Sequence, residues 1–306
     1  MLLMKLLVYG AGIQGSFLAA QLCNNPQNHV TILARGPRYQ QLVTHGLRLH
    51  HILQHQTTQT PIHVIQTLAA DDAYDFIFVT MKYNDFPTVV PVLQANCSHQ
   101  ILLIGNQLTP EPLQQALPQK ALYFGFQNTG GTRQGAQINV LRFGKGHLDV
   151  IAGSQAPVPQ ATLHQIFQKT AYTWGQRLDL FDWLAQHAAL ITVLNNFDML
   201  YQTDAHKARP YFKVAAHAFG ELQALLIDRH IQRPHWQERL IATPWVMNLG
   251  LRLLYHTPIL KLAAGNFKEI AALNQRFTEF SVQQQRATPA FQRLAQQATR
   301  IFKPTA

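Results

Sequence analysis

The 306-residue sequence predicts an α/β domain, built on a doubly wound parallel sheet, followed by an all-α domain. Short apolar runs alternate with helical patterns through the first half, which is typical of βαβ units. From about Leu178 the strand signals give way to long segments with apolar residues every three or four positions. We therefore expect a first domain over residues 1–176 and a second, helical domain over residues 177–306.

The elements of both domains are expected where the apolar pattern changes from continuous runs to helical spacing. The expected strands of the first domain are Lys5–Tyr9, His29–Ala34, Asp75–Met81, Gln100–Gly105 and Ala121–Gln127. Gln14–Cys23 is expected to form the helix after the first strand, and Gly130–Ile151 a turn-rich, antiparallel stretch. The expected helices of the second domain are Phe181–Met199, Pro210–Arg229, His235–Leu254 and Phe267–Arg286.

The charge distribution argues against nucleic acid as a partner. The formal net charge is +10, but the Lys and Arg residues are scattered and form no run of five or more. A positive field also suits ligands that carry phosphate or carboxylate groups. We therefore expect a small anionic ligand and no nucleic-acid partner.

Cysteine usage and hydropathy indicate a reducing compartment. The two cysteines, Cys23 and Cys97, lie in unrelated contexts, so neither a disulfide framework nor a CxxC zinc site is available. No apolar run reaches the ~18 residues of a membrane span, and glycines interrupt the apolar N-terminal segment. We expect a cytoplasmic protein with no membrane partner.

A group of histidines invites interpretation as a metal site. His45, His50, His51 and His55 lie close together in the sequence. However, no carboxylate or cysteine joins them at ligand spacing, and no HExxH pattern appears. We therefore expect a solvated polar strand here and no bound metal.

A glycine-rich turn follows the first expected strand. Gly10 permits a tight turn, Gly12 leaves room for a diphosphate beside the backbone, and Gly15 lets the helix approach the strand. The N–H groups at the helix N-terminus can then bind phosphate. In this strand–turn–helix context, the pattern G-x-G-x-x-G predicts a Rossmann-type domain that binds a dinucleotide. The six expected binding residues are Gly10, Ala11, Gly12, Ile13, Gln14 and Gly15.

The end of the second strand indicates which dinucleotide to expect. NAD-specific domains usually carry an acidic residue about 20 residues after the last glycine, where it binds the ribose 2′-hydroxyl. Here Arg35 occupies that position and Arg38 follows closely. Guanidinium groups can bind a 2′-phosphate through paired hydrogen bonds. We therefore expect NADP as the cofactor; the alternative is that both arginines are solvated loop residues.

These residues resemble the ketopantoate reductase family, the NADPH-dependent 2-oxo acid reductases of pantothenate synthesis. The resemblance implies a small-molecule carbonyl substrate. It also implies that Lys82 lies beside the nicotinamide, that Asn106 stands in the family's Asn-Gly turn, and that Glu269 contacts substrate. The likeness rests on four stretches of the first half and a weaker one in the second: Gly10–Gly15, Val30–Gly36, Asp75–Lys82, Ile104–Gln107 and Phe267–Asn274.

One position departs from the family pattern. The family carries a catalytic lysine, two residues past a tryptophan, on the first helix after the nucleotide-binding domain, with asparagines four and eight residues further along. If His187 replaces the lysine, those positions are Ile191 and Asn195, so the second asparagine is retained as a substrate-binding candidate. A two-residue shift of the alignment at Trp183 would instead leave no catalytic counterpart.

His187 has the chemistry to replace the lysine. Reduction of a carbonyl requires a proton donor near its oxygen, and imidazolium donates near neutral pH. His187, Ile191 and Asn195 lie at four-residue spacing and so share one face of a helix. The alternative is that His187 is an ordinary core or surface residue in a chain that contains 15 histidines.

Three other candidates have positions or a resemblance that favour ligand contact. Lys82 and Asn106 each follow an apolar strand, and open α/β sheets bind ligands outside the carboxyl ends of their strands. We expect Lys82 to act in catalysis and cofactor binding, and Asn106 to contact both cofactor and substrate. Glu269 is expected to act in catalysis and substrate binding. The alternatives are solvated strand ends and an ordinary helix-surface glutamate.

Two functions follow from these residues. The first is an NADPH-dependent reductase of a small 2-oxo acid or related carbonyl compound, with ketopantoate itself in doubt because the lysine is missing. The second is an NADP(H)-binding redox sensor or regulator without turnover. The helical domain is expected to hold substrate groups, and a homodimer is one assembly it would allow.

Overall fold

The chain folds as two units in the computed structural model, which describes residues 3–142, 144–153, 156–231, 240, 243–255 and 267–302. The first unit comprises residues 1–105 and 109–180, and the second comprises residues 106–108 and 181–306. The main division therefore falls between residues 180 and 181, whereas we expected it between residues 176 and 177. The segment Asn106–Leu108 groups with the helical unit, which the sequence did not indicate.

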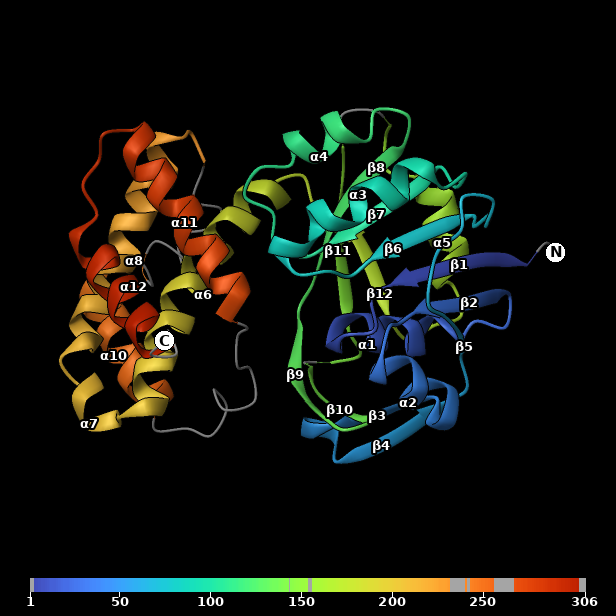
Figure 1. Ribbon diagram of the computed structural model, residues 1–306, viewed down its shortest axis with the longest axis horizontal. Coiled ribbons are helices and arrows are strands. Elements are labelled where there is room, and N and C mark those ends of the chain that lie inside the picture. The colour runs from blue at the N-terminus through green and yellow to red at the C-terminus, as the bar shows by residue number, and fades with distance from the viewer. Residues whose placement is uncertain are drawn as a thin grey trace. The chain divides into compact units, whose positions relative to one another are not determined.

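An eight-stranded sheet runs through the first unit (Figure 1). Neighbouring strands are parallel except β8 and β11, which are antiparallel. The chain continues from β1 to β2 on one side and later to β6 on the other, so the strand order reverses at β1. This arrangement confirms the expected Rossmann-type fold. The spatial order is β12 (Thr173–Gln176), β11 (His147–Ala152), β8 (Ala121–Gln127), β7 (Gln100–Ile104), β6 (Phe76–Val79), β1 (Met4–Tyr9), β2 (Asn28–Leu33) and β5 (His63–Ile65).

The central strands are buried along their length, as their continuous apolar sequences predict for a sheet covered on both faces. All of β6 and residues 6–9 of β1 are buried. Alternate side chains, such as Val8 and Phe78, join one apolar cluster with Phe17 and Phe167 of the flanking helices. The helices of this unit are α1 (Ile13–Leu22), α2 (Pro37–His45), α3 (Phe86–Ala95), α4 (Glu111–Ala116) and α5 (Gln160–Phe167), with short 3-10 helices at Ile52–Gln54 and Tyr83–Asp85.

A second sheet of four strands lies in the same unit. β9 and β10 form an antiparallel hairpin within the stretch expected to be turn-rich, but β10 also pairs in parallel with β3. Helix α1 packs against β3, β9 and β10. The hairpin is therefore held beside the first helix of the dinucleotide fingerprint. The order in this sheet is β4 (Gln56–Thr60), β3 (Leu47–His51), β10 (Gln137–Arg142) and β9 (Thr129–Gln134).

The expectation of a solvated polar strand is wrong for one of the grouped histidines. His51, on β3, is only 3% exposed, and its ring packs against Phe17 at a centroid distance of 6.1 Å. Its Nε2 atom lies 3.1 Å from the Thr58 Oγ1 atom. Burial, together with the charges of Arg142 and His50, lowers the pKa of His51. His51 is thus a core residue, because β3 alternates between buried and half-buried positions.

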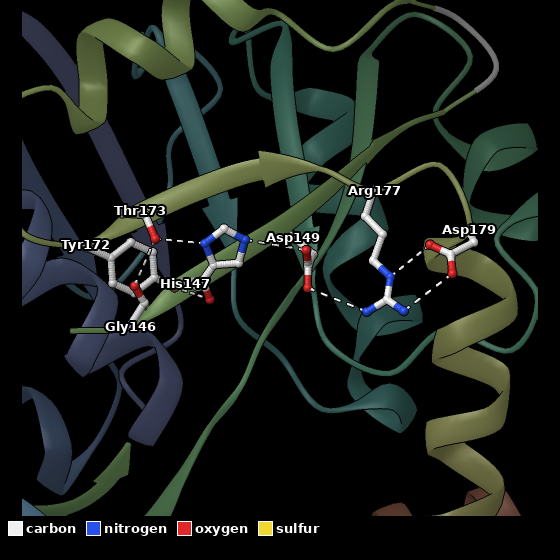
Figure 2. Close-up of polar contacts among 7 residues, drawn as sticks. All are labelled: Gly146, His147, Asp149, Tyr172, Thr173, Arg177 and Asp179. Carbon is white, nitrogen blue, oxygen red and sulfur yellow. Dashed lines mark hydrogen bonds and ion pairs between the residues drawn. The ribbon is translucent and has the colours of Figure 1, made fainter. Parts of the chain in front are cut away.

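A row of polar side chains joins β11 to β12 at one edge of the large sheet (Figure 2). The His147 Nδ1 atom lies 2.7 Å from the Thr173 Oγ1 atom, and its Nε2 atom lies 3.5 Å from an oxygen of Asp149. Arg177 bridges Asp149 and Asp179, and its Nε atom donates to Asp179 at 2.9 Å. Asp179 directly precedes α6 (Leu180–Thr203), so these contacts fix the position of the residue before the first turn of that helix.

The described part of the second unit contains only helices and their connections. Asn196 and Asn274 exchange amide hydrogen bonds of 2.7 and 3.0 Å and so join α6 to α11. The expected helix His235–Leu254 lies partly outside the described residues. No helix in the described part of the chain is long and apolar enough to cross a membrane. After α6 the helices are α7 (Ala205–Ala208), α8 (Tyr211–Asp228), α10 (Pro244–Tyr255), α11 (Phe267–Gln283) and α12 (Pro289–Phe302).

Candidate dinucleotide-binding site

The glycine-rich turn connects β1 to α1 and is shaped by close approach of the backbone. Gly10 has a backbone φ angle of 118°, which residues other than glycine rarely adopt. A Cβ atom at Gly15 would lie 1.9 Å from the Gly10 carbonyl oxygen, so only glycine lets α1 come this close. A Cβ atom at Gly12 would instead meet no atom within 4 Å. The turn is therefore closed on the strand side and open at Gly12.

The N-terminus of α1 is suited to phosphate. Gly12 is the residue before its first turn, no side chain caps the helix, and no acidic residue lies in that turn. Unpaired backbone N–H groups at such a position attract anions. Of the other predicted residues, Gln14 exchanges hydrogen bonds with Gln127, and Ile13 packs against the apolar core. Their side chains thus stabilise the start of α1.

A cavity of about 290 Å³ opens beside this turn, where the strand order reverses. Ligands of doubly wound sheets bind at such a reversal, outside the carboxyl ends of the strands. The lining includes the predicted residues Gly10, Ala11, Gly12, Arg35, Arg38 and Lys82, and it also includes Arg133 of β9. Segments that are far apart in the sequence therefore converge on one cavity.

Arg35 is exposed at the end of β2. Its Nη2 atom donates a 2.7 Å hydrogen bond to the Tyr9 hydroxyl, and its guanidinium carbon lies 5.8 Å from the centre of the Tyr9 ring. A guanidinium has five N–H donors, so this contact orients Arg35 and leaves donors for an anion. Its binding to a 2′-phosphate stays a prediction.

Arg38 has a different environment from the one expected. It is 7% exposed, and its guanidinium donates to the Ala11 and Ala136 carbonyl oxygens and to the Ser16 hydroxyl at 2.9–3.2 Å. Burial lowers the pKa of Arg38 to about 10, with a further contribution from the nearby charge of Arg133. Arg38 thus lines the cavity but uses most of its donors within the protein.

Two polar residues of the helical unit, each expected to contact a ligand, form a hydrogen bond with each other. The Asn106 Nδ2 atom donates a 3.2 Å hydrogen bond to the Glu269 carboxylate. The buried Asn106 Oδ1 atom has no hydrogen-bond partner among the described residues, and neither has the Nε2 atom of Gln107, a residue that is 2% exposed. Buried polar groups are normally paired, so these two atoms are candidates for ligand contact. Gln107 was not among the site residues predicted from the sequence, although it stands where the family's Asn-Gly turn has a glycine.

His187 lies on the half-buried face of α6 together with Ile191 and Asn195. Its ring stacks on Trp183 with centroids 4.9 Å apart and an angle of 9° between the planes. Burial lowers the pKa of His187 to about 4. The ring is therefore uncharged at neutral pH, which differs from the imidazolium that we expected. A neutral imidazole can still donate one hydrogen bond.

Comparison with solved structures supports the fold. A PanE/ApbA family ketopantoate reductase from Ralstonia eutropha JMP134 is 18% identical, with a TM-score of 0.73 over 97% of this chain and 98% of that one. A 2-dehydropantoate 2-reductase from Methylococcus capsulatus is 15% identical, with a TM-score of 0.68 over 99% of each chain. D-mandelate dehydrogenase, solved with NADH and anilino(oxo)acetate, is 17% identical, with a TM-score of 0.71 over 97% of this chain and 98% of that one.

Sequence comparison finds one family similar to the first half of the chain. A 2-dehydropantoate 2-reductase of Mesorhizobium japonicum is 25% identical over 138 residues, which are 45% of this chain. The chain matches only 38% of the length of that relative. The family model described as ketopantoate reductase PanE/ApbA matches residues 6–153, which contain the glycine-rich turn, the cavity lining and both sheets apart from β12. Residues 6–153 of this chain are therefore similar to the ketopantoate reductase PanE/ApbA family.

Proposed function

We propose that this protein is an NADPH-dependent oxidoreductase that reduces a small 2-oxo acid or a related carbonyl compound. The proposal rests on the cavity at the strand reversal, where an open glycine turn meets the exposed Arg35. The match of residues 6–153 to the ketopantoate reductase PanE/ApbA family model supports the same class of reaction.

The cavity residues fit a dinucleotide that carries a 2′-phosphate. The open side of Gly12 and the uncapped N-terminus of α1 suit the diphosphate. Arg35 stands where NAD-specific domains usually carry an acid. When bound, NADPH would supply the hydride that reduces the carbonyl carbon. Because D-mandelate dehydrogenase was solved with NADH, the preference between the two cofactors is the first property to measure.

The substrate class is inferred from the polar groups that lack partners. A 2-oxo acid presents a ketone and a carboxylate, whose oxygens accept hydrogen bonds. The buried Gln107 Nε2 atom is a donor without an acceptor among the described residues. Lys82 adds positive charge at the cavity of the first unit, which favours an anionic substrate. The names of the compared proteins, 2-dehydropantoate 2-reductase and D-mandelate dehydrogenase, point to the same class of acids.

His187 is retained as a candidate catalytic residue in a changed role. With its pKa lowered by burial, its neutral ring would donate a hydrogen bond to the carbonyl oxygen, and the proton that completes the alcohol after hydride transfer would come from water. A neutral imidazole can polarise a carbonyl in this way. Glu269, paired with Asn106, is the candidate for accepting a hydrogen bond from a substrate hydroxyl group.

A second candidate function is an NADP(H)-binding sensor without turnover. It is favoured by His187, the candidate replacement for the family's lysine, which stacks on Trp183 and has a lowered pKa. A protein of this kind would retain the cofactor cavity and release no reduced product.

Titration and steady-state kinetics test both candidates. NADPH and NADH are titrated separately into the purified protein, and NADPH oxidation is then followed with a panel of 2-oxo acids that includes ketopantoate. The reductase proposal expects tighter binding of NADPH and turnover with at least one acid. Tight NADPH binding without turnover on any acid would instead support the sensor, and tighter binding of NADH would overturn the choice of cofactor.

A further inference from the structure

We propose that Arg133, on the second sheet, binds the adenosine 2′-phosphate together with Arg35, and that Arg38 positions Arg133 rather than binding the phosphate itself. This inference rests on the proposed function and deepens it, since it names the residue that discriminates NADPH from NADH. Neither the sequence motif nor the position after β2 points to Arg133.

The alternation of side chains along β9 determines which face of the strand carries Arg133. Thr129 and Gly131, at alternate positions of the same strand, are buried, while Arg133 is exposed near the end of the strand. Because alternate residues of a strand share a face, Arg133 shares the face of Thr129 and Gly131. Its side chain lines the same cavity as Arg35.

Arg38 connects three segments of the first unit through hydrogen bonds. Its guanidinium donates to Ala11 in the glycine-rich turn, to Ser16 in α1 and to Ala136 in the turn between β9 and β10. Three of its five N–H groups are therefore engaged by the protein. The hairpin that carries Arg133 is thus held against the phosphate-binding turn by Arg38.

The described lining of the cavity carries more positive than negative side chains. Within the described residues, neither Arg35 nor Arg133 forms an ion pair with a carboxylate. Asp85 is the one acidic residue in the described lining of the cavity, and it accepts a hydrogen bond from Asn84. Cationic groups gathered in one cavity repel one another, and a phosphate of charge about −2 relieves that repulsion. A ribose 2′-hydroxyl does not, which gives the preference for NADPH.

The direct test uses 2′,5′-ADP and 5′-AMP, which differ only by the phosphate in question. Arg133→Ala is expected to weaken binding of 2′,5′-ADP and NADPH about ten- to a hundredfold, the effect of losing a hydrogen bond between charged groups. Binding of 5′-AMP and NADH should change less than about twofold. Arg48→Ala is the matched control, because it removes a positive charge from β3 of the same sheet but does not belong to the described cavity lining; it should leave all four affinities unchanged.

The role of Arg38 is tested by combining variants. If Arg38 positions Arg133, the ratio of NADPH to NADH affinity should respond to Arg133→Ala much less in an Arg38→Met background than in the wild type. If Arg38 has only a structural role, Arg133→Ala should change that ratio by the same factor in the Arg38→Met background as in the wild type.

The outcomes separate this inference from the proposed function. A wild-type protein that binds neither cofactor, or that prefers NADH, would overturn the proposed function. A wild type that prefers NADPH, with an Arg133→Ala variant that keeps the full preference, would overturn only the role of Arg133. Equal losses for NADPH and NADH in that variant would also overturn it.

Discussion

The Arg38 guanidinium donates a 2.9 Å hydrogen bond to the carbonyl oxygen of Ala136, a residue 98 positions further along the chain. The same side chain contacts the glycine-rich turn and the first turn of α1. One buried cation therefore joins the dinucleotide fingerprint to the hairpin of the second sheet. The contacts of this residue predict a measurable contribution to stability.

Arg38→Met is expected to lower the free energy of unfolding by about 2–4 kcal/mol. The variant removes three hydrogen bonds made by a charged group and leaves the Ala11 and Ala136 oxygens without this donor. Urea unfolding measures the change. Arg300→Met, at an exposed position of α12, is the control and should change stability by less than about 0.5 kcal/mol. A loss no larger than that of the control would show that these bonds contribute little.

Two glycines of the fingerprint should respond differently to alanine. Gly12→Ala is expected to fold with stability close to wild type, because its Cβ meets no atom within 4 Å, but to bind NADPH at least about tenfold more weakly, since that space is needed for the diphosphate. Gly15→Ala is expected to destabilise the fold, because its Cβ would lie 1.9 Å from the Gly10 oxygen. Thermal unfolding and NADPH titration distinguish the two effects. Normal NADPH affinity in Gly12→Ala would contradict the assignment of the open side to the diphosphate.

Gln107→Leu separates stability from substrate binding. The variant removes a buried donor that has no partner among the described residues, so the free energy of unfolding should stay within about 1 kcal/mol of wild type. If Gln107 donates to the substrate, KM for the active 2-oxo acid should rise about tenfold. Gln223→Leu, at a buried position of α8 that is 3% exposed, is the control for removing a buried amide. An unchanged KM in Gln107→Leu would exclude the contact.

His187 should make stability depend on pH. Its pKa is about 4 in the folded protein and about 6.5 in an unfolded chain. Between these values the unfolded state binds more protons, so the free energy of unfolding falls as pH decreases from about 6.5 towards 4. His187→Gln should flatten this dependence by at most about 1.4 kcal/mol per pH unit. His51, whose pKa is also lowered, contributes equally to both proteins, so their difference isolates His187. Parallel curves would show that His187 does not titrate in this way.

Much of the first unit could be predicted from the sequence because its signals are local. The continuous apolar runs of β1, β6 and β7 indicate buried parallel strands whatever surrounds them. The glycine spacing of residues 10–15 likewise reflects the geometry of one turn. β4 was missed because its sequence is rich in polar residues. β3 was expected only as a solvated polar strand, because its pairing with β10 joins segments far apart in the chain.

The roles of the polar residues were harder to predict from the sequence. Arg35 and Arg38 are near neighbours in the sequence and received the same prediction, yet one is exposed and the other is buried among backbone carbonyls. Residue type and spacing do not show how many guanidinium N–H groups of an arginine form hydrogen bonds within the protein. The pKa of His187 was unpredictable for the same reason, since burial and not sequence position lowers it.

The sequence by itself indicated the glycine-rich turn, the succession of the main strands along the chain and the resemblance of the first half to a known family, because each depends on short segments read in order. The tertiary structure decided which cations line the cavity, which polar groups find partners and which histidines have a lowered pKa. These properties depend on distances between remote segments and on the removal of water from around them, and neither quantity is present in a linear sequence.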